Sequence, residues 1–149
     1  PVTIIMEITC MQFSYYASLG LCVLLVDFLF GYRPHSGQIF SPSSFDLSQN
    51  YCFLTISAHS LNIVFVIMAE AFIIEKANKC LDYTLTLFIV HIFSVWIHTR
   101  KFPWSLEWWL INAGLIFVTT ILAEWTCMKI EQQEIKLTLD VDNIKTIVK

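Results

Sequence analysis

Charged residues are scarce in this chain of 149 residues, because Asp, Glu, Lys and Arg together make up 14% of it while hydrophobic residues make up 56%. The mean hydropathy is +0.65. So few polar side chains cannot cover the surface of a water-soluble globule of this size. The net charge of −3 and the lack of a basic cluster also argue against nucleic-acid binding. The composition therefore predicts a protein whose solvent is a lipid bilayer.

The chain also lacks the motifs that organise known catalytic and metal sites. It contains no HExxH, no GxSxG and no glycine-rich phosphate loop. Its cysteines form no CxxC pair, a pattern typical of small apolar fillers rather than of a disulfide framework or a zinc site. They are Cys10, Cys22, Cys52, Cys80 and Cys127. We therefore expect no enzyme activity, no cofactor and no bound metal.

Long apolar runs are abundant instead, and they cover about residues 8–30, 51–74, 81–97 and 106–128. A helix needs roughly 20 apolar residues to cross the hydrocarbon core of a bilayer. The runs therefore predict an all-α membrane protein, with a four-span transmembrane helix bundle in residues 1–130 and a polar tail in residues 131–149. The longest connection, residues 31–50, is rich in Gly, Pro and Ser, so we expect it to run outside the bilayer.

The turn before the fourth run carries interface signals. Pro103 suits the first turn of a helix, where its missing N–H leaves no hydrogen bond unmade. Indole rings favour the membrane interface, because the ring is apolar and its N–H finds a partner there. The sequence therefore predicts interface anchors at Trp104, Trp108 and Trp109.

Lysine and arginine are distributed unevenly between the two sides that four spans define. The second link and the tail share one side, which holds Lys76, Lys79, Lys129, Lys136, Lys145 and Lys149. The opposite side holds Arg33, Arg100 and Lys101. Positive residues prefer the cytosolic side of a membrane. We therefore expect both termini, and with them the tail, to be cytosolic.

Polar residues inside the spans are costly, because a charge near the bilayer centre costs about 2.5 to 3.5 kcal/mol on insertion scales. Asn62 and His91 lie closest to the midplane. We expect a neutral His91 to bond Asn62 or Ser94 between helices, with a proton-relay or metal function as the alternative. Asp82 falls in the first turn of its helix, where the helix dipole favours a carboxylate.

Motifs in the first, third and fourth spans resemble a known family. The first span contains Tyr15-Tyr16-Ala17-Ser18-Leu19-Gly20-Leu21 and then Leu25-Val26-Asp27. The later spans contain Cys80-Leu81-Asp82-Tyr83-Thr84, His91, Trp96, Phe102-Pro103, Trp108-Trp109-Leu110, and Glu124 followed by Cys127-Met128. Together they resemble the Sys family of Golgi integral membrane proteins, whereas residues 31–50 and most of the second span match it poorly.

The resemblance implies a non-enzymatic function at the trans-Golgi network membrane. Family members are receptors for an Arf-related small GTPase with an acetylated N-terminus, and they thereby support vesicle traffic and golgin tethering. A docking site for such a partner is expected at the cytosolic span ends, between helices. The candidate partner-binding residues are Tyr15, Tyr16, Glu70, Asp82, Tyr83, Glu124 and Trp125.

Two other functions stay open at this point. A small membrane transporter or channel would bind ions through intramembrane groups, with Asp27, Glu70, His91 or Glu124 as the candidates. A membrane-embedded hydrolase or acyltransferase would need a pair of catalytic side chains that converge at one depth. Only the receptor is supported by the resemblance.

Overall fold

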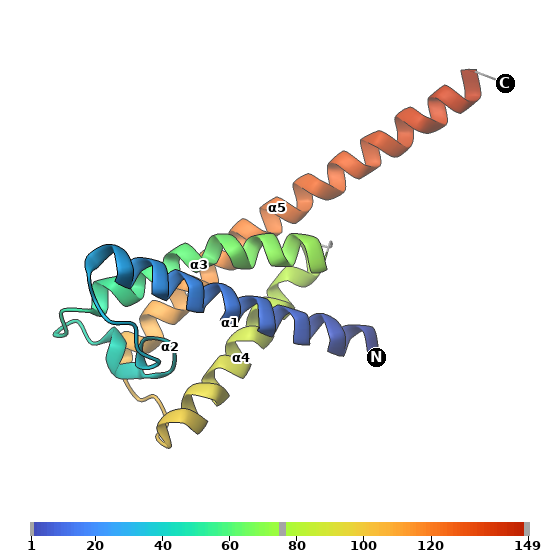
Figure 1. Ribbon diagram of the computed structural model, residues 1–149. Helices are drawn as coiled ribbons and strands as arrows, with labels where there is room; N and C mark the ends of the chain where they lie inside the picture. The colour runs from blue at the N-terminus through green and yellow to red at the C-terminus, as the bar shows by residue number, and fades with distance from the viewer. Residues whose placement is uncertain (1, 75–76, 148–149) are drawn as a thin grey trace.

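The structure is a computed structural model that describes residues 2–74 and 77–147, and in these ranges it contains helices and no strand (Figure 1). The long helices are α1 (Val2–Phe30), α3 (Cys52–Ile73), α4 (Cys80–Thr99) and α5 (Leu106–Ile147). The short ones are α2 (Gly37–Phe40), η1 (Pro42–Phe45) and η2 (Ala77–Lys79). All four long helices are apolar and long enough to cross a bilayer. The predicted all-α, four-span fold is confirmed.

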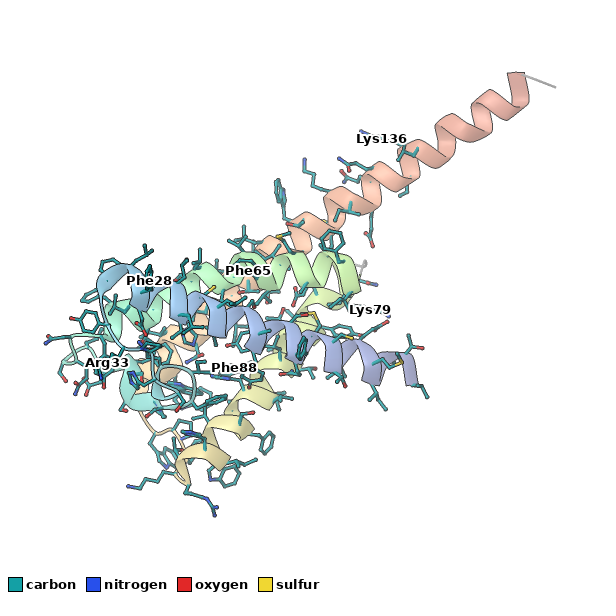
Figure 2. The ribbon with its side chains drawn as sticks, in the orientation of Figure 1. Phe28, Arg33, Phe65, Lys79, Phe88 and Lys136 are labelled. Atoms are coloured by element: carbon teal, nitrogen blue, oxygen red, sulfur yellow. The ribbon has the colours of Figure 1, made fainter. Side chains whose placement is uncertain are left out.

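The four long helices form a bundle with two different ends. Helix α3 packs against both α1 and α5, and α4 packs on α5 and less extensively on α1. One end, here called the tail end, holds the start of α1, the link from α3 to α4 and the extension of α5 (Figure 1). The other, the loop end, holds residues 31–51 and 100–105 (Figure 1). Figure 2 shows Lys79 at the tail end and Arg33 at the loop end.

Close apolar packing holds α1 to α3. Leu19 is fully buried and packs in one cluster with Val23 of its own helix and with Leu54 and Ala58 of α3. Small residues such as Ala58 let two helices approach closely, which favours association inside a membrane. The outer surface is apolar too, and Phe28 is 84% exposed there (Figure 2). In a bilayer such side chains contact lipid.

Two helices extend beyond their predicted spans. Helix α1 begins at Val2 rather than near residue 8. Helix α5 continues without a break past residue 128 to Ile147, so the predicted tail is helical as far as that residue. At 1.5 Å per residue α5 is roughly 60 Å long, about twice the thickness of the hydrocarbon core. Its second half therefore projects beyond the bundle, as Figure 1 shows.

The loop of residues 31–50, expected to run outside the bilayer, also packs back onto the end of the bundle. Gln38 is buried and donates a hydrogen bond from Nε2 to Oδ1 of Asp27, at 2.9 Å. Phe45 is fully buried and its ring lies 5.0 Å from that of His59, measured between centroids. Glycine and proline content predicts where helices break, but it does not reveal that an apolar side chain in the loop returns to the core. The loop closes this end of the bundle.

The three tryptophans predicted as interface anchors separate into different environments. Trp104 is 85% exposed, as an anchor would be. Trp109 donates from Nε1 to the carbonyl oxygen of Pro103 at 2.7 Å. Trp108 is 0% exposed and packs with Phe45 and Val95, so its assignment as an interface anchor is wrong. The helical period turns this indole inward while its neighbours stay at the rim.

Candidate functional site

A groove opens between α1 and α4 at the tail end, with a volume of about 210 Å³. Apolar side chains from the first two turns of α1 line it on one side, and polar side chains from the start of α4 line it on the other. Its lining residues are Ile4, Ile8, Lys79, Asp82, Tyr83 and Thr86. We call it the α1–α4 groove.

Local helix chemistry explains the polar side of the groove. Lys79 is the N-cap residue of α4, and Asp82 lies in the first turn. A carboxylate there interacts favourably with the exposed N–H groups and with the positive end of the helix dipole. The groove thus has a cation and an anion beside an apolar wall.

Hydrogen bonds join α1 to α4 at two depths. Beside the groove, the Tyr83 hydroxyl donates to Oε2 of Glu7. Further into the bundle, the Tyr16 hydroxyl lies 3.3 Å from Nδ1 of His91. Interhelical hydrogen bonds of this kind contribute only about 0.6 to 2 kcal/mol in membranes. These bonds add to an apolar cluster on the same side of the bundle, in which Met11 of α1 packs with Leu87 of α4.

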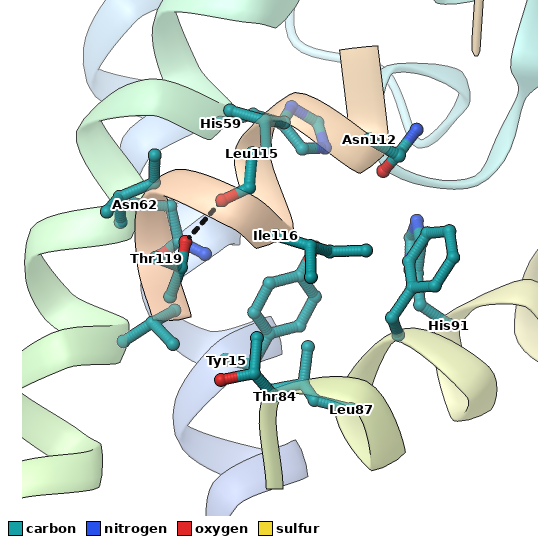
Figure 3. A pocket seen from close by; sticks show the side chains of 13 residues that line it. Tyr15, His59, Asn62, Thr84, Leu87, His91, Asn112, Leu115, Ile116 and Thr119 are labelled. Atoms are coloured by element: carbon teal, nitrogen blue, oxygen red, sulfur yellow. Dashed lines mark hydrogen bonds between the residues drawn. The ribbon is translucent and has the colours of Figure 1, made fainter. Parts of the chain in front are cut away.

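A second polar site, here called the polar chamber, lies in the middle of the bundle and has a volume of about 50 Å³. Tyr15 of α1 lines it, and the other three long helices each contribute two polar side chains. These are His59 and Asn62 of α3, Thr84 and His91 of α4, and Asn112 and Thr119 of α5 (Figure 3). The remaining lining is aliphatic or aromatic. The chamber shares no lining residue with the α1–α4 groove.

Between these two sites, α3 and α5 meet the start of α4 through buried contacts. Glu70 is 0% exposed, and its Oε1 accepts a hydrogen bond from Thr84 Oγ1 at 2.6 Å. The sulfur atoms of Cys80 and Cys127 lie 3.3 Å apart, in a cluster with Ala71 and Ala123. These small side chains allow the helices to approach closely.

The chain matches the family described as "Integral membrane protein S linking to the trans Golgi network", SYS1, over residues 1–137. The chain belongs to the SYS1 family. The resemblance found in its motifs is thereby confirmed. Two curated relatives carry the name "Protein SYS1 homolog". The one from Nematostella vectensis is 37% identical over 138 residues, which are 93% of this chain and 87% of the relative.

The second relative, from Dictyostelium discoideum, is 28% identical over 137 residues. These cover 92% of this chain and 59% of the longer Dictyostelium protein. No solved structure matches the chain. SYS1 membership therefore establishes an integral membrane protein of a Golgi trafficking family.

The structure brings only part of the predicted partner-binding set together in this SYS1 chain. Asp82 and Tyr83 line the α1–α4 groove. Glu70 is enclosed with Thr84 and does not line it. Glu124 and Trp125 lie on α5, where Trp125 is 56% exposed with Lys129 Nζ 5.3 Å from its ring centroid.

The expected placement of Tyr15 and Tyr16 at the cytosolic span end is wrong. Because α1 begins at Val2, these tyrosines lie roughly 20 Å along the helix. Tyr15 lines the polar chamber, and Tyr16 contacts His91. The sequence predicted that His91 bonds Asn62 or Ser94. The structure instead places the Tyr16 hydroxyl beside His91 Nδ1.

Sequence reasoning missed Glu7, Ile4 and Ile8 as residues of the site. Glu7 lay just outside the predicted span and was not considered for a contact between helices. The available signal was its position directly before an apolar run, where a carboxylate can reach a polar group on a neighbouring helix. Among the described residues, no group of three or more His, Cys, Asp or Glu side chains has a metal-binding arrangement.

Proposed function

We propose that this protein is a receptor at the trans-Golgi network membrane that binds an Arf-related small GTPase through its acetylated N-terminus. By recruiting this GTPase it supports vesicle traffic and golgin tethering. The support from the comparisons is membership of the SYS1 family, whose description links it to the trans-Golgi network. The support from the geometry is the α1–α4 groove, which carries the proposal.

The need for such a groove follows from the weakness of small lipid anchors. Each buried CH₂ contributes about 0.8 kcal/mol, and even a myristoyl chain gives only reversible membrane binding. An acetyl group is far smaller, so it cannot hold a GTPase at a membrane by itself. A protein surface at the membrane has to supply the remaining affinity.

The α1–α4 groove has the features that this partner requires. Acetylation removes the charge of an N-terminus and leaves a neutral, compact group. Ile4 and Ile8 offer that group an apolar wall, against which an unpaired ammonium would lose hydration. Tyr83, Thr86 and the charged pair of Lys79 and Asp82 offer hydrogen bonds to the peptide that follows.

The orientation of the bundle also suits this function. Counted over the sequence, six of the nine Lys and Arg residues belong to the tail-end link and the tail. The positive-inside preference then places the tail end, with the groove, toward the cytosol. The extension of α5 would project into the same compartment, beside a docked partner.

The proposal is tested by recovery of the GTPase on the purified protein, comparing acetylated with unacetylated N-termini. We expect the acetylated form to be recovered preferentially. Ile8→Trp fills the groove and should lower this recovery at least tenfold, about 1.4 kcal/mol of binding free energy. Ile5→Trp is the matched control, because Ile5 is 64% exposed and lies outside the groove lining.

Two results would contradict the receptor. Equal recovery of both forms would show that the acetyl group is not recognised, and full recovery on Ile8→Trp would show that the groove is not the site. A transporter instead predicts solute flux in reconstituted vesicles that Glu70→Gln abolishes. The receptor predicts no flux and unchanged recovery of the GTPase by Glu70→Gln, because Glu70 is enclosed away from the groove.

A further inference from the structure

The polar chamber contains buried atoms whose hydrogen-bonding capacity is not used by the described residues. They are Nε2 of His59, Oδ1 of Asn62 and Nε2 of His91. Their side chains are 4%, 2% and 1% exposed, respectively. In the hydrocarbon core no bulk water is present to pair with them, and each unsatisfied polar group costs several kcal/mol. We therefore expect these atoms to form hydrogen bonds with a molecule that enters the chamber.

The hydrogen bonds of His59 fix which kind of partner it needs. Its Nδ1 lies 2.9 Å from the carbonyl oxygen of Thr55, which can only accept, so Nδ1 carries the hydrogen. A cationic imidazole is costly at this depth, and the ring is therefore neutral. The Nε2 of a neutral ring protonated on Nδ1 is an acceptor. Asn62 Oδ1 is an acceptor as well, so both side chains require a donor.

Three other polar side chains of the chamber direct a hydrogen to an acceptor other than His59 or Asn62. Thr119 donates to the carbonyl oxygen of Leu115 at 2.7 Å (Figure 3). Asn112 donates from Nδ2 to the carbonyl oxygen of Trp108 at 2.8 Å. The Thr84 hydroxyl donates to Oε1 of Glu70, which does not line the chamber. His59 Nε2 and Asn62 Oδ1 therefore keep unpaired lone pairs.

These two acceptors limit the chemistry of a ligand that pairs with them. A carbonyl or an anion has no hydrogen to donate to His59 Nε2 or Asn62 Oδ1. A cation would lack a counter-charge, because no Asp or Glu lines the chamber. A neutral O–H group fits, since it donates to one acceptor at little cost of desolvation.

The size of the chamber agrees with a small group. Its volume of about 50 Å³ exceeds the roughly 10 to 15 Å³ that one enclosed water requires on this scale. It could hold a few waters, or the hydroxyl end of a lipid whose apolar part lies against the aliphatic lining. Both sources present the same chemistry to His59 and Asn62.

We propose that the polar chamber is a binding site for a neutral hydroxyl donor, which donates its hydrogen to His59 Nε2 beside Asn62 Oδ1. The hydroxyl belongs either to enclosed water or to a membrane lipid such as a diacylglycerol or a sterol. Binding there connects α3 to the ligand at the centre of the bundle. Because the chamber and the α1–α4 groove share no lining residue, this site does not depend on the receptor function.

The test is nitrogen-15 NMR of the full chain with labelled histidines, in phosphatidylcholine nanodiscs with and without added diacylglycerol or cholesterol. We expect the His59 Nε2 signal to be displaced from that of a free acceptor nitrogen toward that of a hydrogen-bonded one. Asn62→Leu fills the chamber with an apolar side chain and should reverse this displacement. Ser57→Ala, an exposed change on the same helix, should preserve it.

Comparison of nanodiscs with and without the added lipid distinguishes the two sources of the hydroxyl. A displacement already present in phosphatidylcholine alone, with a cross-peak to water, assigns the donor to enclosed water. A displacement that appears only with the added lipid assigns it to the lipid hydroxyl. A free acceptor signal in every nanodisc, or a protonated Nε2, overturns the proposal. These readouts come from the wild-type chain, so the test stands even if Asn62→Leu does not fold.

Discussion

The two ends of the bundle differ in whether the chain itself covers them. At the loop end, Phe45, Val95 and Trp108 are all 0% exposed, and the buried pair of Gln38 and Asp27 attaches the loop to α1. At the tail end, the α1–α4 groove remains open and α5 continues past the other helices (Figure 1). The loop end is closed by its own chain, whereas the tail end keeps an open groove.

The two ends also differ in the contacts that stabilise them. Aromatic packing at the loop end buries large apolar rings, which contribute most per residue to a core. The tail-end contact between α1 and α4 combines the hydrogen bond from Tyr83 to Glu7 with aliphatic packing of Met11 and Leu87. We therefore expect substitutions at the loop end to reduce stability most, and substitutions at the tail end to change binding with less effect on folding.

The largest effect is expected for Trp108→Ala at the loop end. Removing a fully buried indole should lower the free energy of unfolding by about 3 to 5 kcal/mol, because the transfer energy of the ring is lost and a cavity remains. Denaturant titration of the purified protein in detergent measures this loss. Trp104→Ala, at an 85% exposed site, should change it by less than about 0.5 kcal/mol. Equal losses would show that both indoles lie at the interface.

A smaller effect is expected for Tyr83→Phe at the tail end. The change removes the hydroxyl that donates to Glu7 and should lower the free energy of unfolding by about 1 kcal/mol. Recovery of the acetylated GTPase should fall more clearly than stability does, because Tyr83 also lines the groove. Tyr32→Phe, at a half-exposed site in the loop, is the control. A loss of stability as large as that of Trp108→Ala would remove the distinction between the two ends.

The smallest effect concerns Asp46 in the closing loop. The hydroxyl of Ser48, and after it the Ser48 backbone N–H, hold the pKa of the Asp46 carboxyl below its usual value. A lowered folded-state pKa gives stability that is present above the unfolded-state pKa of about 3.9 and is lost as the pH falls through the lower folded-state value.

The measurement is a carbon-13 NMR titration of the Asp46 carboxyl in wild type and in Ser48→Ala. We expect the pKa of Asp46 to return toward its usual value in Ser48→Ala and to stay low in the control Ser36→Ala. The difference in stability between wild type and Ser48→Ala should disappear in acid. An unchanged Asp46 titration in Ser48→Ala would exclude this turn as the cause.

Much of the fold could be predicted because it depends on length and polarity. A run such as residues 81–97 can satisfy its backbone hydrogen bonds in hydrocarbon only as a helix, and this needs no knowledge of its neighbours. The helix ends were less predictable. The first turn of α1 and the extension of α5 are helical although the apolar runs begin later and end earlier, because helix formation does not stop at a change of polarity.

The candidate site was predictable only in part. Asp82 and Tyr83 were found because they lie at the start of a span, and a span start is fixed by the sequence. Glu70, at a comparable distance from its span end, turns into the bundle instead. Tyr15 and Trp108 carry the same composition signals as interface residues, yet packing places both inside. Depth along a helix can be estimated from sequence, whereas the face that meets a neighbour cannot.

The sequence by itself determined that four helices are long and apolar enough to cross a bilayer and that the chain belongs to the SYS1 family, since hydropathy, span length and local motifs are properties of contiguous residues. Only the tertiary structure decided that Phe45 packs with Trp108 at one end, that Ile8 faces Tyr83 in a groove and that His59 and His91 share a chamber. The two residues of each pair are distant in the chain. Their meeting depends on how the helices rotate and cross, which is set by packing of the whole bundle.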